Sequence, residues 1–175
     1  MEYPTRKEVR LQDFDYSQNG AYFVTICANN RCENLAYICR GEALLRPLGI
    51  IVEQEIQNLS KRYDITIDKY VIMPNHIHIL VNVQRAEQSP APTVIGNNNN
   101  RETKGKPTIG DVVCGLKSIT TKIANKQDNI INRKIWQRSF HDHVIRNEKD
   151  YQKIWEYIEN NPKQWELDQY YTSGQ

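Results

Sequence analysis

All four histidines of the sequence fall into two H-x-H pairs, His76-Ile77-His78 and His141-Asp142-His143. In an extended strand, residues i and i+2 point to the same face, so each pair would present two imidazoles side by side. Two neutral imidazoles suit a divalent ion such as Mg²⁺, Mn²⁺ or Zn²⁺. The first pair opens the strand-like run HIHILVNV, whose alternate apolar residues would face a core. We therefore interpret His76 and His78 as candidate metal ligands. The alternative is a pair of half-exposed strand histidines.

A tyrosine near the end of the chain is the candidate nucleophile. Residues 148–160 predict a helix that must end before Pro162. The packed face of this helix is marked by apolar side chains spaced i, i+3 and i+7: Tyr151, Ile154 and Ile158. Tyr157 and Asn161, four residues apart, share a face to one side of that stripe. A phenol there can reach a neighbouring metal site, and the amide oxygen of Asn161 can bind the same ion. Taken alone, Tyr157 reads as a packing residue.

The second histidine pair follows the segment IWQRSF, in which basic and aromatic residues are interleaved. Such a segment can line a nucleic-acid path, with arginine on phosphates and aromatic rings on bases. Although the net charge is only +2, the stretch from Arg101 to Arg138 holds nine Lys or Arg against three Asp or Glu. Local clusters matter more than the total for phosphate affinity. The alternatives are a partly buried edge strand and a solvated charged face. The residues that we expect to contact DNA are Lys117, Trp136, Gln137, Arg138, His143 and Arg146.

Hydrophobic periodicity predicts the elements that would position these residues. Strands are expected at residues 21–28, 65–73 and 76–83, with a further short strand within 132–146. Helices are expected at residues 47–62, 108–126 and 148–160. The order strand, helix, strand, strand, helix, strand is typical of the ferredoxin-like βαββαβ plan. We therefore predict an α+β fold with one antiparallel sheet, helices on one of its faces, and an additional C-terminal helix.

Length and composition indicate an ordinary globular protein. The chain of 175 residues fits one domain, residues 1–175, and its 39% hydrophobic and 25% charged residues are unexceptional. Residues 84–107 contain Ser-Pro, Ala-Pro and an asparagine run, and are expected to form a flexible loop. The sequence lacks a bilayer-spanning apolar run and a signal-like N-terminus, so we expect a cytoplasmic protein with no membrane partner. Its four cysteines lack paired C-x-x-C spacing and are expected to be reduced thiols.

Three segments, in this order, resemble the REP-associated tyrosine transposases, which belong to the HUH single-tyrosine transposase superfamily. They are RLQDFDYSQNGAYFVTICANNR, VIMPNHIHILV and IWQRSFHDHVIRNEKDYQKIWEYIENNP. The resemblance runs from about Arg10 to about Trp165 and is poor over residues 84–107. It implies an HUH endonuclease fold on a ferredoxin-like sheet.

The resemblance also implies a set of roles. His76 and His78 match the metal-binding pair, and Tyr157 matches the nucleophile in the pattern Y-I-x-x-N-P. Asn161 stands where relatives carry a polar metal ligand, often Gln in the insertion-sequence branch. The implied cofactor is Mg²⁺ or Mn²⁺, and the implied substrate is single-stranded DNA, typically with a hairpin beside the cleavage site. Relatives act as monomers or as dimers that share active sites, which leaves a homodimer open.

Two other functions are weighed against this one. Two-histidine phosphoesterases need Ser or Thr two residues after each histidine, where this sequence has His78 and His143. A non-catalytic DNA-binding protein would keep the fold without a nucleophile. The presence of His76, His78 and Tyr157 together favours a metal-dependent endonuclease and strand transferase that forms a 5′-phosphotyrosine. Tyr170 and Tyr171 are expected in a mobile tail, poorly placed for attack.

Overall fold

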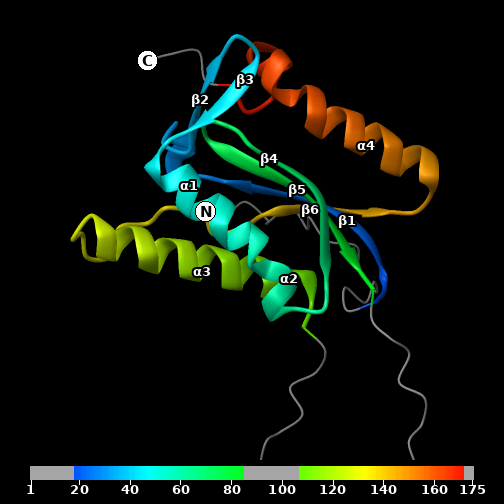
Figure 1. Ribbon diagram of the computed structural model, residues 1–175, viewed down its shortest axis with the longest axis horizontal. Helices are drawn as coiled ribbons and strands as arrows, with labels where there is room; N and C mark the ends of the chain where they lie inside the picture. The colour runs from blue at the N-terminus through cyan, green and yellow to red at the C-terminus, as the bar shows by residue number, and fades with distance from the viewer. Residues whose placement is uncertain (1–17, 85–106, 172–175) are drawn as a thin grey trace, which may run out of the picture.

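One four-stranded antiparallel sheet organises the chain, with the strand order β4-β5-β1-β6 (Figure 1). The computed structural model describes residues 18–84 and 107–171. The strands are β1 Gly20–Cys27, β4 Thr66–Ile72, β5 His76–Val83 and β6 His141–Ile145. Because β1 pairs with β5 on one side and β6 on the other, it lies between the two strands that carry the histidine pairs.

Helices cover both faces of this sheet. Helix α1 (Pro47–Gln57), the short α2 (Leu59–Arg62) and α3 (Ile109–Gln127) lie on one face, and α4 (Glu148–Asn160) crosses the other (Figure 1). Thr108 and Asp111 start α3 with a reciprocal capping box, and Asn147 caps α4 through the backbone N–H of Asp150. The prediction of an antiparallel ferredoxin-like α+β fold with an additional C-terminal helix is confirmed.

The structure adds elements that the sequence did not predict. A hairpin joins β2 (Ala36–Cys39) to β3 (Glu42–Leu45), and two 3-10 turns, η1 (Asn29–Arg31) and η2 (Asn161–Leu167), flank the sheet. The hairpin turns tightly at Arg40 and Gly41, whose φ angles are 52° and 78°. Its strands are four residues long and half exposed, so they lack the apolar alternation that reveals a strand. The expected helix over residues 47–62 is divided at Asn58.

The loop expected at residues 84–107 lies almost entirely outside the described residues, so it stays a prediction. Within the parts of the chain that are described, none of the helices is both long enough and apolar enough to cross a membrane.

Strand β5 shows why its histidines are available for chemistry. Ile77, Ile79 and the two valines that follow in register point into the core beneath α1 and α3. His76 and His78 point to the opposite face, which α4 and η2 cover. The same alternation in β1 places Phe23 and Thr25 on the histidine face. The metal candidates are therefore buried, but they lie outside the main core.

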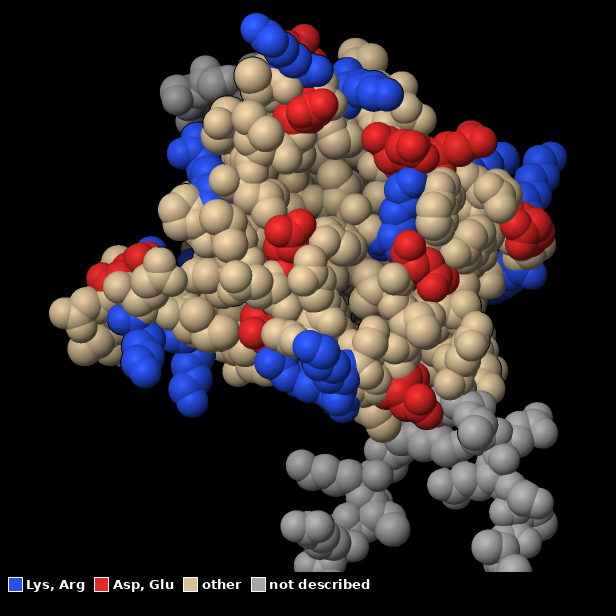
Figure 2. All heavy atoms as spheres, viewed as in Figure 1, with Lys and Arg blue, Asp and Glu red and all other residues tan. Residues whose placement is uncertain are grey.

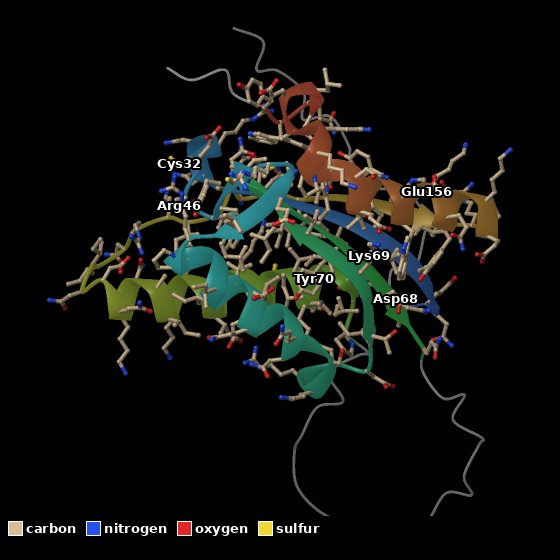
Figure 3. The ribbon with its side chains drawn as sticks, turned by 45° about the horizontal axis from the view of Figure 1, so that its top comes forward. Cys32, Arg46, Asp68, Lys69, Tyr70 and Glu156 are labelled. Carbon is tan, nitrogen blue, oxygen red and sulfur yellow. The ribbon has the colours of Figure 1, made fainter. Side chains whose placement is uncertain are left out.

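Helix α4 is fixed to the sheet by polar contacts as well as by packing. Lys69 of β4 forms an ion pair with Glu159 at 2.8 Å and lies 4.3 Å from the ring centre of Trp155. Its neighbour Asp68, labelled beside Lys69 in Figure 3, accepts a hydrogen bond from the Tyr151 hydroxyl at 3.0 Å. Burial and this carboxylate raise the pKa of Tyr151 to about 12. These contacts hold the helix that carries Tyr157 in one position over β4 and β5.

Two helical glycines offer a matched test of the packing between the hairpin and α1. A Cβ at Gly49 would lie 2.1 Å from the backbone oxygen of Leu35, whereas a Cβ at Gly115 would meet only the end of the Tyr63 side chain. We expect Gly49→Ala to lower the free energy of unfolding by about 1–3 kcal/mol, because backbone cannot move aside cheaply. Gly115→Ala should change it by about 1 kcal/mol or less, since Tyr63 can rotate and alanine favours the helix. Urea unfolding measures the free energy of unfolding of both variants. Equal losses in the two variants would contradict the expectation.

Candidate active site

The two histidines of β5 form the centre of the site. Their Nε2 atoms lie 3.0 Å apart, and both rings are buried. Each Nδ1 is held by a side-chain oxygen, His76 by Asn75 at 2.9 Å and His78 by Thr25 at 2.8 Å. Such partners fix the orientation of an imidazole and favour metal binding at its other nitrogen. The two Nε2 atoms therefore converge on one point.

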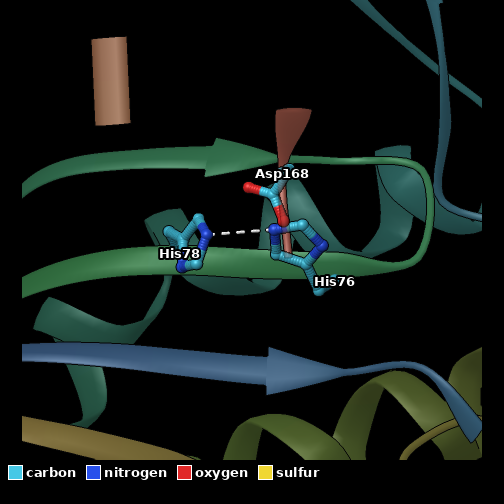
Figure 4. Close-up of side chains that lie close together, drawn as sticks. All are labelled: His76, His78 and Asp168. Carbon is cyan, nitrogen blue, oxygen red and sulfur yellow. Dashed lines mark hydrogen bonds between the residues drawn. The ribbon is translucent and has the colours of Figure 1, made fainter. Parts of the chain in front are cut away.

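A carboxylate from the end of the chain joins the pair. One nitrogen of each histidine and one oxygen of Asp168 lie within 4.8 Å of one another, so the three residues form a group that could hold a metal ion (Figure 4). Asp168 directly follows η2, and its Oδ1 accepts from the backbone N–H of Tyr170 at 2.7 Å. Asp168 was not predicted from the sequence, because it stands at no motif-like spacing from the histidines. It reaches them only through the turn of η2.

Asn161, the third metal ligand expected from the sequence, lies buried beside Asp168. Its Nδ2 donates to the Asp168 Oδ2 at 2.8 Å. Its Oδ1 is buried and has no hydrogen-bond partner among the described residues. A buried polar atom without a partner costs about 1–3 kcal/mol, and a cation is one partner that would remove this cost. The donor set of two imidazoles, a carboxylate and an amide oxygen thus fits a divalent ion.

The phenol of Tyr157 lies at the edge of this group, within the same chain. Its oxygen is 3.3 Å from the Nε2 of His78 and donates to the Asp168 Oδ2 at 3.2 Å. The ring stands edge-on to Phe23, and the residue is 38% exposed. Burial, and then the negative charge of Asp168, raise the pKa of Tyr157 above its ordinary value. Without a nearby cation, the phenol therefore stays protonated at neutral pH.

Burial makes the histidine pair neutral. It lowers the pKa of His76 to about 4; Asp168 opposes this shift, and Arg31 adds to it. Burial, and then the neighbouring His76, lower the pKa of His78 well below its ordinary value. A histidine must be neutral to bind a metal ion. Both imidazoles are therefore neutral at neutral pH, as metal binding requires, without a local base.

These pKa shifts predict a pH dependence of stability in the absence of metal. The unfolded chain takes up a proton at His76 below about pH 6.5, and the folded chain does so only near pH 4. The contribution of the neutral, buried His76 to the free energy of unfolding is thus complete above pH 6.5. It is lost as the pH falls toward 4. From pH 6.5 to 5 we expect a loss on the order of 2 kcal/mol, at about 1.4 kcal/mol per pH unit.

Urea unfolding in EDTA at these two pH values would measure this loss. His76→Gln should reduce it. The same loss in both proteins would assign it to other groups.

A cleft of about 480 Å³ gives access to the site. It is lined by Tyr157, His78 and Asp168, with Phe23 and Thr25 from β1. Phe23 and Thr25 also line a neighbouring cleft of about 380 Å³, which contains Arg31 and the second histidine pair. The two clefts therefore share the exposed part of the sheet face over β1.

The second histidine pair lies on the same face as the first, and β1 separates the two pairs. Thr25 of β1 is in register with His78 on one side and His141 on the other. The Nε2 of His143 lies 2.8 Å from a carboxylate oxygen of Asp150, and the residue remains exposed. The structure thus places this pair outside the group of His76, His78 and Asp168.

The other residues expected to contact DNA divide into surface and structural positions. Arg138 and Arg146 are exposed. Lys117 is bound to the loop before β6. Its Nζ donates to the backbone oxygens of Gln137 at 2.9 Å and Ser139 at 2.8 Å. The half-buried Gln137 is also tied through its backbone N–H to Cys27.

Trp136 is only 8% exposed, and its indole N–H donates to Thr120 at 2.8 Å, so its ring is packed in the core rather than offered to a base. In the view of Figure 2, basic side chains project along the lower edge, at α2 and α3, and acidic ones are interspersed over the visible face.

Tyr170 is placed differently from the sequence expectation of a mobile tail. It is buried, with its ring centre 4.5 Å from that of His76, and its backbone oxygen accepts from Asn75 at 2.8 Å. Tyr171 is 37% exposed and packs edge-on to Trp165. The segment after η2 thus closes the metal group on the side away from Tyr157.

No protein-family model matches the sequence. An uncharacterized protein of Haemophilus influenzae is 35% identical over 170 residues, which are 95% of this chain and 93% of that protein. The chain belongs to the same protein family as this relative.

The fold is similar to that of a REP-associated tyrosine transposase solved with a REP hairpin bound. The TM-score is 0.60 at 20% identity, and the match covers 89% of this chain and 74% of the other. The resemblance stated from the sequence is therefore confirmed at the level of the fold. The chain has a transposase-like fold with a histidine group that could hold a metal ion.

Proposed function

We propose that this protein is a metal-dependent endonuclease and strand transferase for single-stranded DNA that acts through a covalent bond to Tyr157. One observation carries the proposal: the Tyr157 phenol lies 3.3 Å from His78 and 3.2 Å from Asp168, in the chain that supplies both. A nucleophile beside a candidate metal group is the arrangement that phosphoryl transfer needs. The likeness of the fold to a tyrosine transposase supports the same chemistry.

His76, His78 and Asp168 would hold the ion, with the amide oxygen of Asn161 as a further candidate. We propose Mg²⁺ or Mn²⁺ as the ion. When bound, it would polarise the scissile phosphate and offset the negative charge that builds in the transition state. Thr25 and Asn75 keep the two imidazoles oriented for this role through their Nδ1 atoms.

The Tyr157 oxygen attacks the phosphorus and passes its proton to Asp168, which already accepts its hydrogen bond. The bond from phosphorus to the 3′ oxygen breaks, and that oxygen takes up a proton to become a free 3′-hydroxyl. The product is a 5′-phosphotyrosine. A 3′-hydroxyl from the same or another strand can reverse the reaction, so joining needs no nucleotide cofactor.

The substrate we propose is single-stranded DNA with a neighbouring hairpin. The structural relative was solved with a REP hairpin bound. The cleft in front of Tyr157 is partly aromatic, and it is lined by Phe23 of β1 and by the exposed Lys153 of α4. A single strand can offer unstacked bases to such a surface, whereas a duplex hides them.

The direct test is covalent capture. The wild-type chain would be incubated with end-labelled hairpin oligonucleotides, with Mg²⁺, Mn²⁺ or EDTA, and separated by denaturing electrophoresis. We expect a labelled protein–DNA species with either metal and none in EDTA. Tight binding without any such species would favour a non-catalytic DNA-binding protein.

Arg138 tests the predicted DNA surface. Arg138→Ala should weaken binding and lower the slope of log affinity against log salt by about 0.7, because one cation no longer contacts a single-stranded phosphate. Fluorescence anisotropy over a salt series measures both quantities. Lys126→Ala, an exposed cation on α3 across the sheet, is the control. Unchanged affinity and slope for Arg138→Ala would place this residue away from the DNA.

A further inference from the structure

A second and larger cleft lies next to the candidate active site. Its volume is about 880 Å³, and it lies between the β2–β3 hairpin and η2. Gln164 and Leu167 of η2 line both this cleft and the one that contains Tyr157. We call it the hairpin cleft. A chain leaving the Tyr157 site over η2 would therefore enter it directly.

The hairpin cleft carries unpaired positive charge. Arg40, at the tip of the hairpin, and Lys163, in η2, are both exposed and line the cleft. Neither has an ion-pair or hydrogen-bond partner within residues 18–84 and 107–171. The carboxylates of Glu33 and Glu166 also line the cleft, so its charge is mixed and its two cations are separate contact points.

Aromatic rings line the same cleft. Tyr37 on β2 is 48% exposed and Tyr171 is 37% exposed, and Trp165 forms part of the base. Arg46 lies 5.9 Å from the ring centre of Tyr37 and helps to hold that ring in place. Single-stranded nucleic acids bind such surfaces, because their bases stack on exposed aromatic rings and their phosphates contact cations.

The position of the hairpin relative to η2 is fixed. Gly41 at its tip approaches Lys163 so closely that a Cβ at Gly41 would lie 3.2 Å from the Lys163 side chain. Figure 1 shows the hairpin and η2 side by side at the same end of the sheet. The hairpin tip, which carries Arg40, therefore lies against η2, which carries Lys163.

We propose that the hairpin cleft binds the single-stranded nucleotides that flank the scissile phosphate on one side. Bases stack on Tyr37 and Tyr171, and phosphates contact Arg40 and Lys163. This inference rests on the proposed function, since it assigns the cleft to the same DNA strand. It adds a binding subsite that sets how much of the flanking strand the protein recognises.

Binding in EDTA tests the subsite without any cleavage. Fluorescent oligonucleotides would carry one hairpin and either no flank or six single-stranded nucleotides on the 5′ or the 3′ side. For the wild type, one of the two flanks should increase affinity. For Arg40→Gln/Lys163→Gln, affinity for that oligonucleotide should fall about tenfold at 0.1 M salt, and the salt slope should fall by about 1.4, for two phosphates.

Matched variants separate the subsite from general effects of charge and folding. Lys122→Gln/Lys126→Gln removes two exposed charges from α3, across the sheet, and should change neither quantity. Tyr37→Ala should weaken flank binding about tenfold, and Tyr37→Phe should restore it, because phenylalanine keeps the stacking face.

Several outcomes would overturn the inference. The inference fails if neither flank raises the affinity of the wild type, or if both double variants lose affinity equally. A change in elution volume for Arg40→Gln/Lys163→Gln would assign the cleft to self-association of the chain. If covalent capture succeeds and the flanks add nothing, only this inference fails. If flank binding is found and capture fails, the proposed chemistry is wrong and the subsite stands.

Discussion

Tyr157→Phe is expected to abolish the covalent protein–DNA species, with a loss in rate of ~1000-fold or more, because the substitution removes the attacking atom. The ring keeps its edge-on contact with Phe23. The substitution removes the hydrogen bonds of the hydroxyl to His78 and Asp168. Since Tyr157 is partly exposed, the free energy of unfolding should change by about 1 kcal/mol or less. Denaturing electrophoresis measures the adduct, anisotropy the DNA affinity, and urea unfolding the stability.

The matched control is Tyr170→Phe, which removes the other phenol close to the histidines. This variant should still form the adduct. If Tyr157→Phe forms it at the wild-type rate and Tyr170→Phe does not, the nucleophile is Tyr170. Peptide mapping of the wild-type adduct would give the same assignment without any substitution.

His76→Ala is expected to weaken Mn²⁺ binding on the order of 100-fold or more and to remove cleavage with it. Loss of a residue that only hydrogen-bonds a metal ligand already lowers the metal affinity about 10–100-fold. Loss of the ligand itself should lower it at least as much. Tyr157 remains in place in this variant, so the defect lies in electrostatic support rather than in the attacking atom. Isothermal titration with Mn²⁺, followed by covalent capture, measures the two effects separately.

The second histidine pair provides the control for this experiment. His141→Ala/His143→Ala removes two imidazoles from the same sheet face, and His143 is already paired with Asp150. This double variant should bind Mn²⁺ with wild-type affinity. An equal loss of affinity in both proteins would mean that metal binding does not depend on the β5 pair.

The same titration can decide the third ligand. Asp168→Asn keeps the shape of the side chain and removes its charge, whereas Asn161→Ala removes the amide oxygen that lacks a partner in the described structure. If Asp168 binds the ion, its substitution should cost the larger share of the Mn²⁺ affinity. The reverse order would support the ligand expected from the sequence.

The sequence by itself determined the strand of the histidines and the helix of the tyrosine. The alternation in HIHILVNV has a period of two, so it determines which residues share a face wherever the strand lies. The predicted strand at residues 76–83 and helix at 148–160 match β5 and α4. Both elements have local causes, because the apolar pattern, the Asn147 cap and the following Pro162 all lie within the segment itself.

Only the tertiary structure decided which residues surround the pair. Thr25 comes from a strand 53 residues away and reaches His78 because β1 pairs with β5. Asp168 and Tyr170 reach the site through the turn of η2, whose direction depends on the packing of Trp165 beside His76. Trp136 reads as a surface aromatic in the sequence. In the structure its indole N–H donates to the Thr120 hydroxyl, and the ring is buried.

The physical reason is the same in these cases. A periodic pattern records which face of an element is apolar, whereas a contact between distant segments depends on how the faces meet and leaves no spacing in the sequence. The hydrophobic pattern therefore fixed the scaffold and the direction of His76 and His78. Asp168 became part of the site only when the chain after α4 folded back over the open face of the sheet.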